Sequence, residues 1–252
     1  MVQAKHERQL QDRTLTVFDL HLHTVHGSSD SNLRPEQLIE EAQRIGLDGI
    51  CLTEHSGGWE NYQIIDIFKD SGLVAIGAVE VYTDVGHVIA IGIRNYVSGM
   101  HTAAGLRKVL DKAGGVMIPA HPFRNFFNRP PYNVNLLYKN YDGDLPTTAL
   151  EASKHPLFEL ADDVEIANGC NTDKENLFTL DVARELGFTG TGGSDAHSTQ
   201  GIGKCVTIFD GDIRNEADLI EALKAKAFTA GQGLHVGNLE PFGERSVSEA
   251  TV

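Results

Sequence analysis

The chain has 252 residues, of which 41% are hydrophobic, and a formal net charge of −14. This length allows one large domain with a substantial core, and nothing in the sequence requires a second domain. The acidity argues against general binding of a nucleic-acid backbone, which depends on clustered Lys and Arg, so we expect no stable nucleic-acid complex.

The chain ends and the cysteines predict a soluble, cytoplasmic protein. Residues 1–14 are polar throughout and lack the apolar core of a secretion signal, and no apolar segment reaches membrane-spanning length. The three cysteines, Cys51, Cys170 and Cys205, have no spacing typical of a zinc knuckle or a disulfide framework, which predicts reduced thiols. We expect a polar tail over 1–14, a single domain over 15–235 and a second tail over 236–252.

Short β-branched runs alternate with helical patterns, which is typical of βα units around a parallel sheet. Strands are predicted at 15–23, 49–55, 73–81, 87–93, 115–122, 164–169, 188–195 and 205–209. Helices with start or stop signals are predicted at 35–46, 102–114, 172–187 and 216–227. About seven such units favour a closed barrel, with an open doubly wound sheet as the competing architecture, and both place ligands at the carboxyl ends of strands.

Residues 123–148 form a connection that is longer than usual and rich in aromatics, arginines and prolines. We interpret it as a lid or a substrate loop. Its aromatic side chains either stack on a base or an aromatic leaving group, or anchor the loop to the barrel. These side chains are Phe126, Phe127 and Tyr132.

The stretch FDLHLHT, at residues 18–24, places two histidines on alternate positions at the end of a strand. Because side chains alternate between the faces of a strand, His21 and His23 point the same way and can share or bracket a metal ion. Asp19 lies one step back on that face and is expected to accept the second ring N–H of a histidine.

Other polar residues end their predicted strands in the same way. They are His55, Glu80, His121, Asp195 and His197, while His87 stands at the start of its strand. A single histidine at a strand end is more often hydrogen-bonded or exposed than a ligand. The recurrence of His, Asp and Glu at so many strand ends predicts a polynuclear metal site at one rim. Cys51, deeper on its strand, is expected in the core.

The segments DLHLHT, TEH, GAVEV, GHVIAIGI, PAHP and GGSDAHS, in this order, resemble the motif series of the PHP (polymerase and histidinol phosphatase) superfamily. The resemblance spans roughly residues 18–231. It implies a distorted (β/α)7 TIM-like barrel with two or three divalent ions at the strand carboxyl ends, and hydrolysis of phosphoesters. It implies metal ligands at His21, His23, His55, Glu80, His87, His121, Asp195 and His197. Oxygen and nitrogen ligands without cysteine favour zinc, manganese or iron.

In that family a further His or Asp ligand usually follows the first motif, and this chain offers both His26 and Asp30. The family pattern favours Asp30, which leaves His26 as a group that faces the substrate, supports a ligand or lies exposed. Glu54 has the opposite strand parity to His55, so we expect it to support the site or to lie on the surface. Glu165 either faces the site or has a structural role.

Divalent ions in such a site clamp phosphate oxygens and lower the pKa of a water that attacks phosphorus. A metal-bound water or a nearby imidazole, His197 or His26, could deliver the proton to the leaving oxygen. Arg124 could bind a phosphate oxygen through its planar fork, and Arg129 and Lys204 are weaker candidates for substrate binding.

The predicted substrate is a small phosphomonoester or a nucleotide or oligonucleotide phosphodiester. One alternative is an amidohydrolase-like enzyme that cleaves a C–N or lactone bond, although the chain lacks a bridging lysine at a plausible strand end. Another is a metal-binding barrel without catalysis, which the apparently complete ligand set disfavours.

Overall fold

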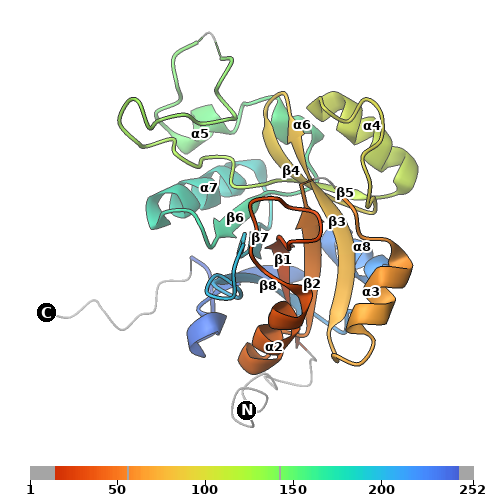
Figure 1. Cartoon of the computed structure of the whole chain (residues 1–252). Helices are drawn as coiled ribbons and strands as arrows, with labels where there is room; N and C mark the ends of the chain where they lie inside the picture. Colours follow the sequence, from red (N-terminus) through yellow and green to blue (C-terminus); the bar gives the residue numbers. More distant parts are fainter. Residues whose placement is uncertain (1–14, 56, 142, 244–252) are drawn as a thin grey trace, which may run out of the picture.

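A computed structural model describes residues 15–55, 57–141 and 143–243 (Figure 1). Its main sheet has eight strands, in the spatial order β10-β9-β8-β1-β2-β3-β4-β5. These strands are β1 (Leu15–Leu22), β2 (Gly49–Glu54), β3 (Val74–Thr83), β4 (Gly86–Ile91), β5 (Val116–Pro119), β8 (Cys205–Asp210), β9 (Phe228–Gln232) and β10 (Glu240–Pro241). A separate parallel pair consists of β6 (Glu165–Asn168) and β7 (Thr191–Gly193).

The helices lie around the outside of the two sheets (Figure 1). They are α2 (Pro35–Ile45), α3 (Asn61–Phe68), α4 (Ala103–Ala113), α5 (Ala149–Ala152), α6 (Leu157–Leu160), α7 (Asp173–Leu186) and α8 (Glu216–Lys224), with a 3₁₀ turn η1 (Leu234–Val236). The four helices predicted from the sequence are confirmed as α2, α4, α7 and α8. No helix of the described ranges combines the length and the apolar character needed to cross a bilayer.

Helix α2 shows why these predictions succeed. Pro35 occupies the first turn, where its missing N–H costs nothing, and Gly46 ends the helix with a φ of 82°. Leu38, Ala42 and Ile45 are buried on one face. Helix α3 was not predicted, because its Ile65 is exposed and blurs the apolar stripe. Helices α5 and α6 have only four residues each and carry too little periodicity to be recognised.

The architecture is α/β, as predicted, but the distorted (β/α)7 barrel is not confirmed, because the main sheet is mixed rather than parallel. The pairs β1–β2 and β2–β3 are parallel, whereas β3–β4, β4–β5, β1–β8 and β8–β9 are antiparallel. For β3 and β4 the antiparallel direction has a local cause, because the two strands are joined by a tight turn that leads into Gly86, with a φ of 112°. A parallel connection would need a dozen or more residues. The main sheet is therefore a curled half-barrel.

The β6–β7 pair brings the last motif beside the first. The backbone N–H of Asp195 donates to the carbonyl of His21 at 2.7 Å, and the N–H of His23 donates to the carbonyl of Ala196 at 3.1 Å. This approach requires Gly193, because a Cβ there would lie 2.4 Å from the Cβ of His21. The ends of β1 and β7 therefore meet at one rim.

Two further predictions concern the core and the C-terminal edge of the domain. Cys51 is fully buried in the core, as predicted. The predicted tail starts later than residue 236, because β10 pairs with β9 and the N–H of Phe242 donates to the carbonyl of Ala230 at 2.8 Å. The predicted tail over 1–14 and the remainder of the C-terminal tail, 244–252, lie outside the described residues.

Candidate metal centre

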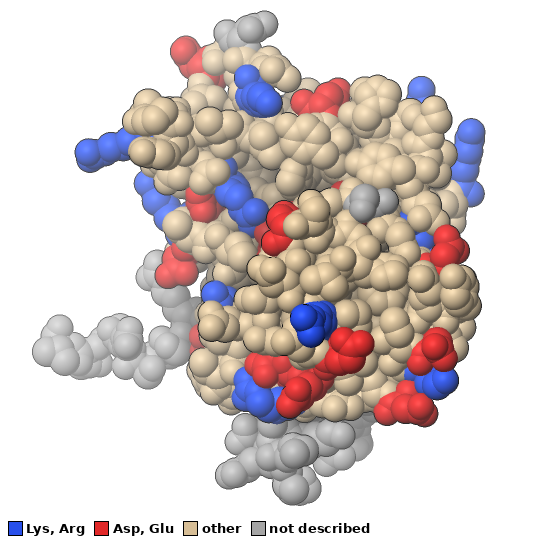
Figure 2. Space-filling view, in the orientation of Figure 1, with Lys and Arg blue, Asp and Glu red and all other residues tan. Residues whose placement is uncertain are grey.

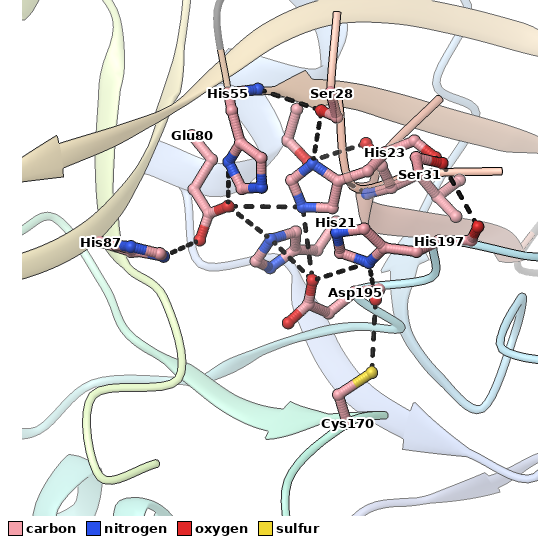
Figure 3. A network of polar contacts seen from close by, with 12 residues as sticks. His21, His23, Ser28, Ser31, His55, Glu80, His87, Cys170, Asp195 and His197 are labelled. Atoms are coloured by element: carbon pink, nitrogen blue, oxygen red, sulfur yellow. Dashed lines mark hydrogen bonds and ion pairs between the residues drawn. The ribbon is translucent and has the colours of Figure 1, made fainter. Parts of the chain in front are cut away.

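His21 and His23 lie at the end of β1, with both side chains fully buried and both rings on the same side of the strand (Figure 3). Two carboxylates face them, Glu80 from β3 and Asp195 just after β7. The Nε2 atom of His23 lies 3.3 Å from Oε2 of Glu80 and 3.3 Å from Oδ1 of Asp195. The Nε2 atom of His21 lies 3.5 Å and 3.6 Å from the same two oxygens.

The two Nε2 atoms are buried and have no hydrogen-bond partner among the described residues. Their Nδ1 atoms are bonded outward: that of His21 lies 2.9 Å from Oε1 of Glu165, and that of His23 lies 3.1 Å from Oγ of Ser28. The Ser28 hydroxyl donates to Glu54 at 2.6 Å, so it accepts the Nδ1–H of His23. In the neutral form of each ring, which is the form that binds a metal ion, the inward Nε2 atom then carries a lone pair. Buried polar atoms without a partner are rare, and this outward bonding is typical of metal-bound histidine, so these residues fit a divalent ion.

Three overlapping groups of side chains could each hold an ion, with their ligand atoms within 4.8 Å of one another. The groups are His23, His55 and His197; His21, His23 and Asp195; and His21, Glu80 and His121. They include every ligand implied by the family resemblance except His87. The Nδ1 atom of His197 lies 3.0 Å from the carbonyl oxygen of Asp195, so in the neutral ring its Nε2 atom is the one that carries the lone pair.

Of the two candidates after the first motif, Asp30 lies beside the cluster and His26 does not. The Oδ2 atom of Asp30 lies 3.3 Å from Nε2 of His55 and 3.4 Å from Nε2 of His197, at an open rim where its side chain is 57% exposed. The ring of His26 stacks on Trp59 at 4.2 Å and donates from Nε2 to the carbonyl of Gly58. His26 is thus held away from the other imidazoles.

His87 stands at the edge of the cluster. Its Nδ1 atom donates to Oε1 of Glu80 at 2.8 Å, and its ring lies 5.3 Å from that of His121. Because it joins none of the three groups found among the described residues, its geometry fits a partner of Glu80 better than a ligand.

The carboxylates of the cluster are held in their charged form. Burial acts to raise the pKa of Glu80 and of Asp195, but the nearby imidazoles, with His21 first among them, outweigh it and hold both pKa values well below their usual range. Burial acts to lower the pKa of His21, and the carboxylates around it raise that pKa well above its usual range. The site therefore concentrates negative charge around the nitrogen atoms, as a cation site requires.

The pKa values of the other titratable groups at the site shift in directions that depend on burial and on neighbouring charges. Burial lowers the pKa of His23, and burial together with the charge of Arg124 lowers that of His121. The hydrogen bond to Glu80 raises the pKa of His55. Partial burial acts to raise the pKa of Asp30, but the charge of the neighbouring imidazoles prevails and lowers it.

Arg124 is directed at the cluster from the start of the long connection. Its Nη2 atom donates to Oδ2 of Asp195 at 2.5 Å and to Oδ1 of Asn168 at 2.9 Å, and its Nε atom donates to Oδ1 of Asn171 at 2.9 Å. Its Nη1 atom has no hydrogen-bond partner within the described residues. The guanidinium is thus fixed beside Asp195 with one donor group left over.

The other two cations proposed for substrate binding are not placed so closely. Arg129 and Lys204 are exposed, and no contact joins either side chain to the cluster in the described part of the chain. Arg129 lies on the long connection, whereas Lys204 precedes β8. The structure gives neither of them a defined role at the centre.

Asp19 does not bind a histidine ring, contrary to the expectation above. Its carboxylate accepts the backbone N–H groups of Ser194 at 2.8 Å, Gly203 at 3.1 Å and His21 at 3.2 Å. Burial raises its pKa to about 6. Asp19 therefore ties the loop after β7 to β1, and Glu165 takes the place beside the His21 ring.

Several supporting residues were missed or left open by the sequence. Glu54 is fully buried and accepts hydrogen bonds from Ser28, from the backbone and hydroxyl of Thr24, and from Nε1 of Trp59. Asn168 is the last residue of β6, a strand-end position like those of the candidate ligands. The recurrence of polar residues at strand ends could therefore have identified it. Ser28 lies in a loop with no comparable signal.

The aromatics of the long connection anchor it to α7. Phe126 stacks on Phe178 at 5.7 Å, Phe127 meets the same ring edge-on at 5.2 Å, and the Lys174 ammonium lies 4.0 Å from the Phe127 ring centre. Tyr132 is 76% exposed. Of the two alternatives above, the structure supports anchoring for Phe126 and Phe127.

The cluster and its motifs match a known family. The model of the PHP domain matches residues 19–144, half of the chain, and a model described as PHP-associated matches residues 174–228. The chain belongs to the PHP family. One curated PHP relative, an error-prone DNA polymerase of Nocardia farcinica (strain IFM 10152), is 32% identical over 73 residues, which are 29% of this chain and 6% of the polymerase.

Solved structures resemble this PHP protein at low sequence identity. A proposed metal-dependent phosphoesterase from Bifidobacterium adolescentis is 19% identical with a TM-score of 0.51, over 82% of this chain and 95% of the other. An amidohydrolase from Chromobacterium violaceum is 16% identical with a TM-score of 0.53, over 82% and 96%. The lesion-specific endonuclease PfuEndoQ from Pyrococcus furiosus is 16% identical with a TM-score of 0.52, over 90% and 57%. These likenesses show a shared fold.

Proposed function

We propose that this PHP protein is a cytoplasmic, metal-dependent hydrolase of phosphoesters that acts on a small phosphomonoester or a nucleotide diester. The observation that carries the proposal is the pair of buried Nε2 atoms, on His21 and His23, that face Glu80 and Asp195 without a hydrogen-bond partner among the described residues. The similarity of this chain to a polymerase, a proposed phosphoesterase and an endonuclease supports phosphoester chemistry.

The three groups described above would hold two or three divalent ions, and Asp30 would add a carboxylate at the open rim. Zinc, manganese and iron all suit a site of imidazoles and carboxylates. Such ions bind phosphate oxygens and lower the pKa of a water molecule until it can attack phosphorus.

The chain's own groups position the substrate. Arg124 has an Nη1 donor with no partner among the residues that the structure describes, and this group lies beside Asp195, where it could bind a phosphate oxygen. Of the two histidines considered as proton donors to the leaving oxygen, His197 lies at the cluster with its side chain 31% exposed, whereas His26 is turned to Gly58. Arg124 is therefore the residue we assign to substrate binding. His197 could deliver a proton only where its Nε2 atom does not hold an ion, so we assign it first to the metal site.

A small substrate agrees with the surface charge. On the face drawn in Figure 2, the basic side chains of the described residues are scattered among acidic ones and form no continuous basic surface. Binding along a nucleic-acid backbone would need such a surface.

The alternative function is cleavage of an amide or a lactone. The similarity to the amidohydrolase from Chromobacterium violaceum gives it some support, but no lysine contacts the cluster in the described part of the chain.

The test is hydrolysis by protein stripped of metal and reloaded with Mn²⁺, Zn²⁺ or Fe²⁺. We expect release of the aryl alcohol from an aryl phosphate or a bis-aryl phosphate, and no comparable release from aryl amides or lactones. Turnover of the monoester alone would indicate a phosphatase, and turnover of the diester a nucleotide-directed enzyme. Failure on both esters in every metal form would refute the proposal.

A second test measures bound metal directly. The double variant His21→Ala, His23→Ala should lose bound metal while its circular dichroism spectrum stays that of a folded protein. The exposed His101 provides a control, since His101→Ala should retain the metal of the unmodified protein. Unchanged metal content in the folded double variant would remove His21 and His23 from the centre.

A further inference from the structure

A cavity of about 80 Å³ lies beside the candidate metal centre, between the β3–β4 turn, the end of β5 and residues 134–137. His87, His121 and Arg124 form its polar wall. Each of these residues contacts a carboxylate of the cluster, Glu80 or Asp195. The cavity therefore adjoins the position where a substrate phosphate would lie.

The rest of the cavity wall is mainly apolar. Val85 comes from the β3–β4 turn, Leu136 from the long connection and Leu157 from α6. Asn125 and Asn135 also line the cavity, but neither they nor these apolar residues carry a charge, so this part of the wall offers no cation for a second phosphate. A hydrocarbon group suits it better.

Hydrogen bonds hold in place the segment that forms one wall of the cavity. The side chain of Asn135 is buried, and its Nδ2 atom donates to the carbonyls of Pro122 at 2.8 Å and Arg124 at 2.9 Å. Its Oδ1 atom accepts the N–H of Tyr138 at 3.2 Å. Asn135 thus holds residues 134–137 against the segment at the end of β5 and fixes the distance between these two walls of the cavity.

The volume limits what can enter. A cavity of about 150 Å³ is known to bind one benzene molecule, so this cavity of about 80 Å³ suits a group of roughly three to five non-hydrogen atoms. A nucleobase or a ribose is too large. A nucleotide would have to place its nucleoside on the open side of the cluster, near Asp30, and leave the cavity unused.

We propose that this cavity binds the organic group of a phosphomonoester of a short aliphatic alcohol, with the phosphate beside Arg124. The inference rests on the proposed function and narrows its substrate class. In the reaction, the oxygen of water forms a bond to phosphorus and the bond from phosphorus to the ester oxygen breaks. The alcohol leaves with one proton of that water, and the water oxygen and its second proton become part of inorganic phosphate.

The experiment compares alkyl phosphates of increasing chain length with manganese-loaded protein. From methyl to n-propyl phosphate, kcat/KM should rise by about fourfold per methylene, the increment expected when a CH₂ group leaves water. It should fall again for phenyl phosphate and for AMP. Equal values for all esters, or a preference for AMP, would overturn the inference.

Cavity-filling variants provide the matched control. Leu136→Phe should lower kcat/KM for n-propyl phosphate at least tenfold and leave methyl phosphate nearly unchanged, and Val134→Phe gives an independent variant should the first not fold. The control Leu150→Phe alters a leucine that is 55% exposed on α5, outside the cavity, and should have no effect. Equal losses on both esters in the two filling variants would contradict the assignment.

Binding separates this inference from the proposed function. Calorimetry with methylphosphonate and n-propylphosphonate, which are not hydrolysed, should show tighter binding of the propyl compound to the metal-loaded protein, and Leu136→Phe should abolish the difference. Absence of turnover on every ester would overturn the proposed function. Binding that is independent of chain length would overturn the cavity assignment, whether or not esters turn over.

Discussion

The Nδ1 atom of His21 lies 2.9 Å from Oε1 of Glu165, and both side chains are almost completely shielded from solvent. The other oxygen of Glu165 accepts the backbone N–H of His121 at 2.9 Å. One buried carboxylate thus fixes the ring of one candidate ligand and the backbone of another. Glu165 is therefore a positioning residue for two of the three groups that could hold an ion.

From this relationship we expect Glu165→Gln to weaken metal binding about tenfold and Glu165→Ala by up to about 100-fold, the range found when outer partners of metal-bound histidines are removed. The amide of Gln can still accept the Nδ1–H but carries no charge, so its effect should be the smaller one. Competition with a fluorescent chelator measures the affinity. Glu159→Gln, at an exposed position on α6, is the control. Equal affinity in all three variants would contradict the role of Glu165.

Glu165 also shows how far the sequence could predict the site. The alternation of side chains along a strand correctly predicted that His21 and His23 share a face. The recurrence of His, Asp and Glu at strand ends predicted that Glu80, His121 and Asp195 converge with them, and the structure brings them together. Glu165 was ambiguous because it stands at the start of β6, three residues before the strand ends. The orientation of His26 depends on a loop held by Ser28 and Thr24, which no periodic pattern describes.

The strand directions were a different kind of error. The predicted strands at 73–81 and 87–93 leave too few residues between them for a parallel crossover, so the spacing itself indicated a hairpin. The alternation of strand and helix patterns elsewhere predicted βα units around a parallel sheet, although this spacing argued against a parallel pair here. The pairing of β1 with β8 could not be predicted in the same way, because those strands are far apart in the chain.

Glu54 is expected to support stability as well as the centre. Its carboxylate accepts hydrogen bonds from Thr24, Ser28 and Trp59, and Glu54→Ala would leave these buried donors unpaired. At about 1 to 3 kcal/mol for each unsatisfied group, the free energy of unfolding should fall by about 3 kcal/mol or more.

Urea denaturation measures this loss by circular dichroism and by the fluorescence of Trp59, the single tryptophan of the chain. The exposed Glu40 on α2 offers a matched control, and Glu40→Ala should change the free energy of unfolding by no more than about 0.5 kcal/mol. A loss for Glu54→Ala no larger than that of the control would show that the network around Glu54 adds nothing to stability.

Arg124 and Arg129 lie on the same connection but have different surroundings. Arg124→Lys keeps the positive charge and loses the planar fork that contacts Asp195, Asn168 and Asn171. For the ester that the protein hydrolyses, kcat/KM should fall about 100-fold, the scale of loss from a misplaced positioning group. Arg129→Lys, at an exposed position, should stay within about twofold.

Metal analysis accompanies these kinetics. Both arginine variants should retain the metal content of the unmodified protein, because neither arginine is a candidate ligand. A large loss of metal in Arg124→Lys would mean that Arg124 acts by holding Asp195 in place rather than by contacting substrate. Equal kinetic losses in both variants would contradict the assignment of Arg124.

The stability of the α5–α6 region should depend on pH through His155. This side chain is buried against the ring of Tyr138, and its Nδ1 atom accepts the N–H of Leu157 at 3.2 Å. Burial lowers the pKa of His155 below its usual value of 6.5, so the unfolded chain binds the proton more readily than the folded one. Its contribution to stability is therefore complete above pH 6.5 and is lost as the pH falls through the lower pKa of the folded state.

His155→Asn keeps an acceptor for the N–H of Leu157 but cannot be protonated. The variant should therefore be less stable than the unmodified protein at pH 8, and this difference in the free energy of unfolding should be smaller at pH 5.5. Urea denaturation at both pH values measures the difference, and the neutral replacement Ser153→Asn should show no such change. A loss for His155→Asn that is equal at the two pH values would exclude His155 as the source of the dependence.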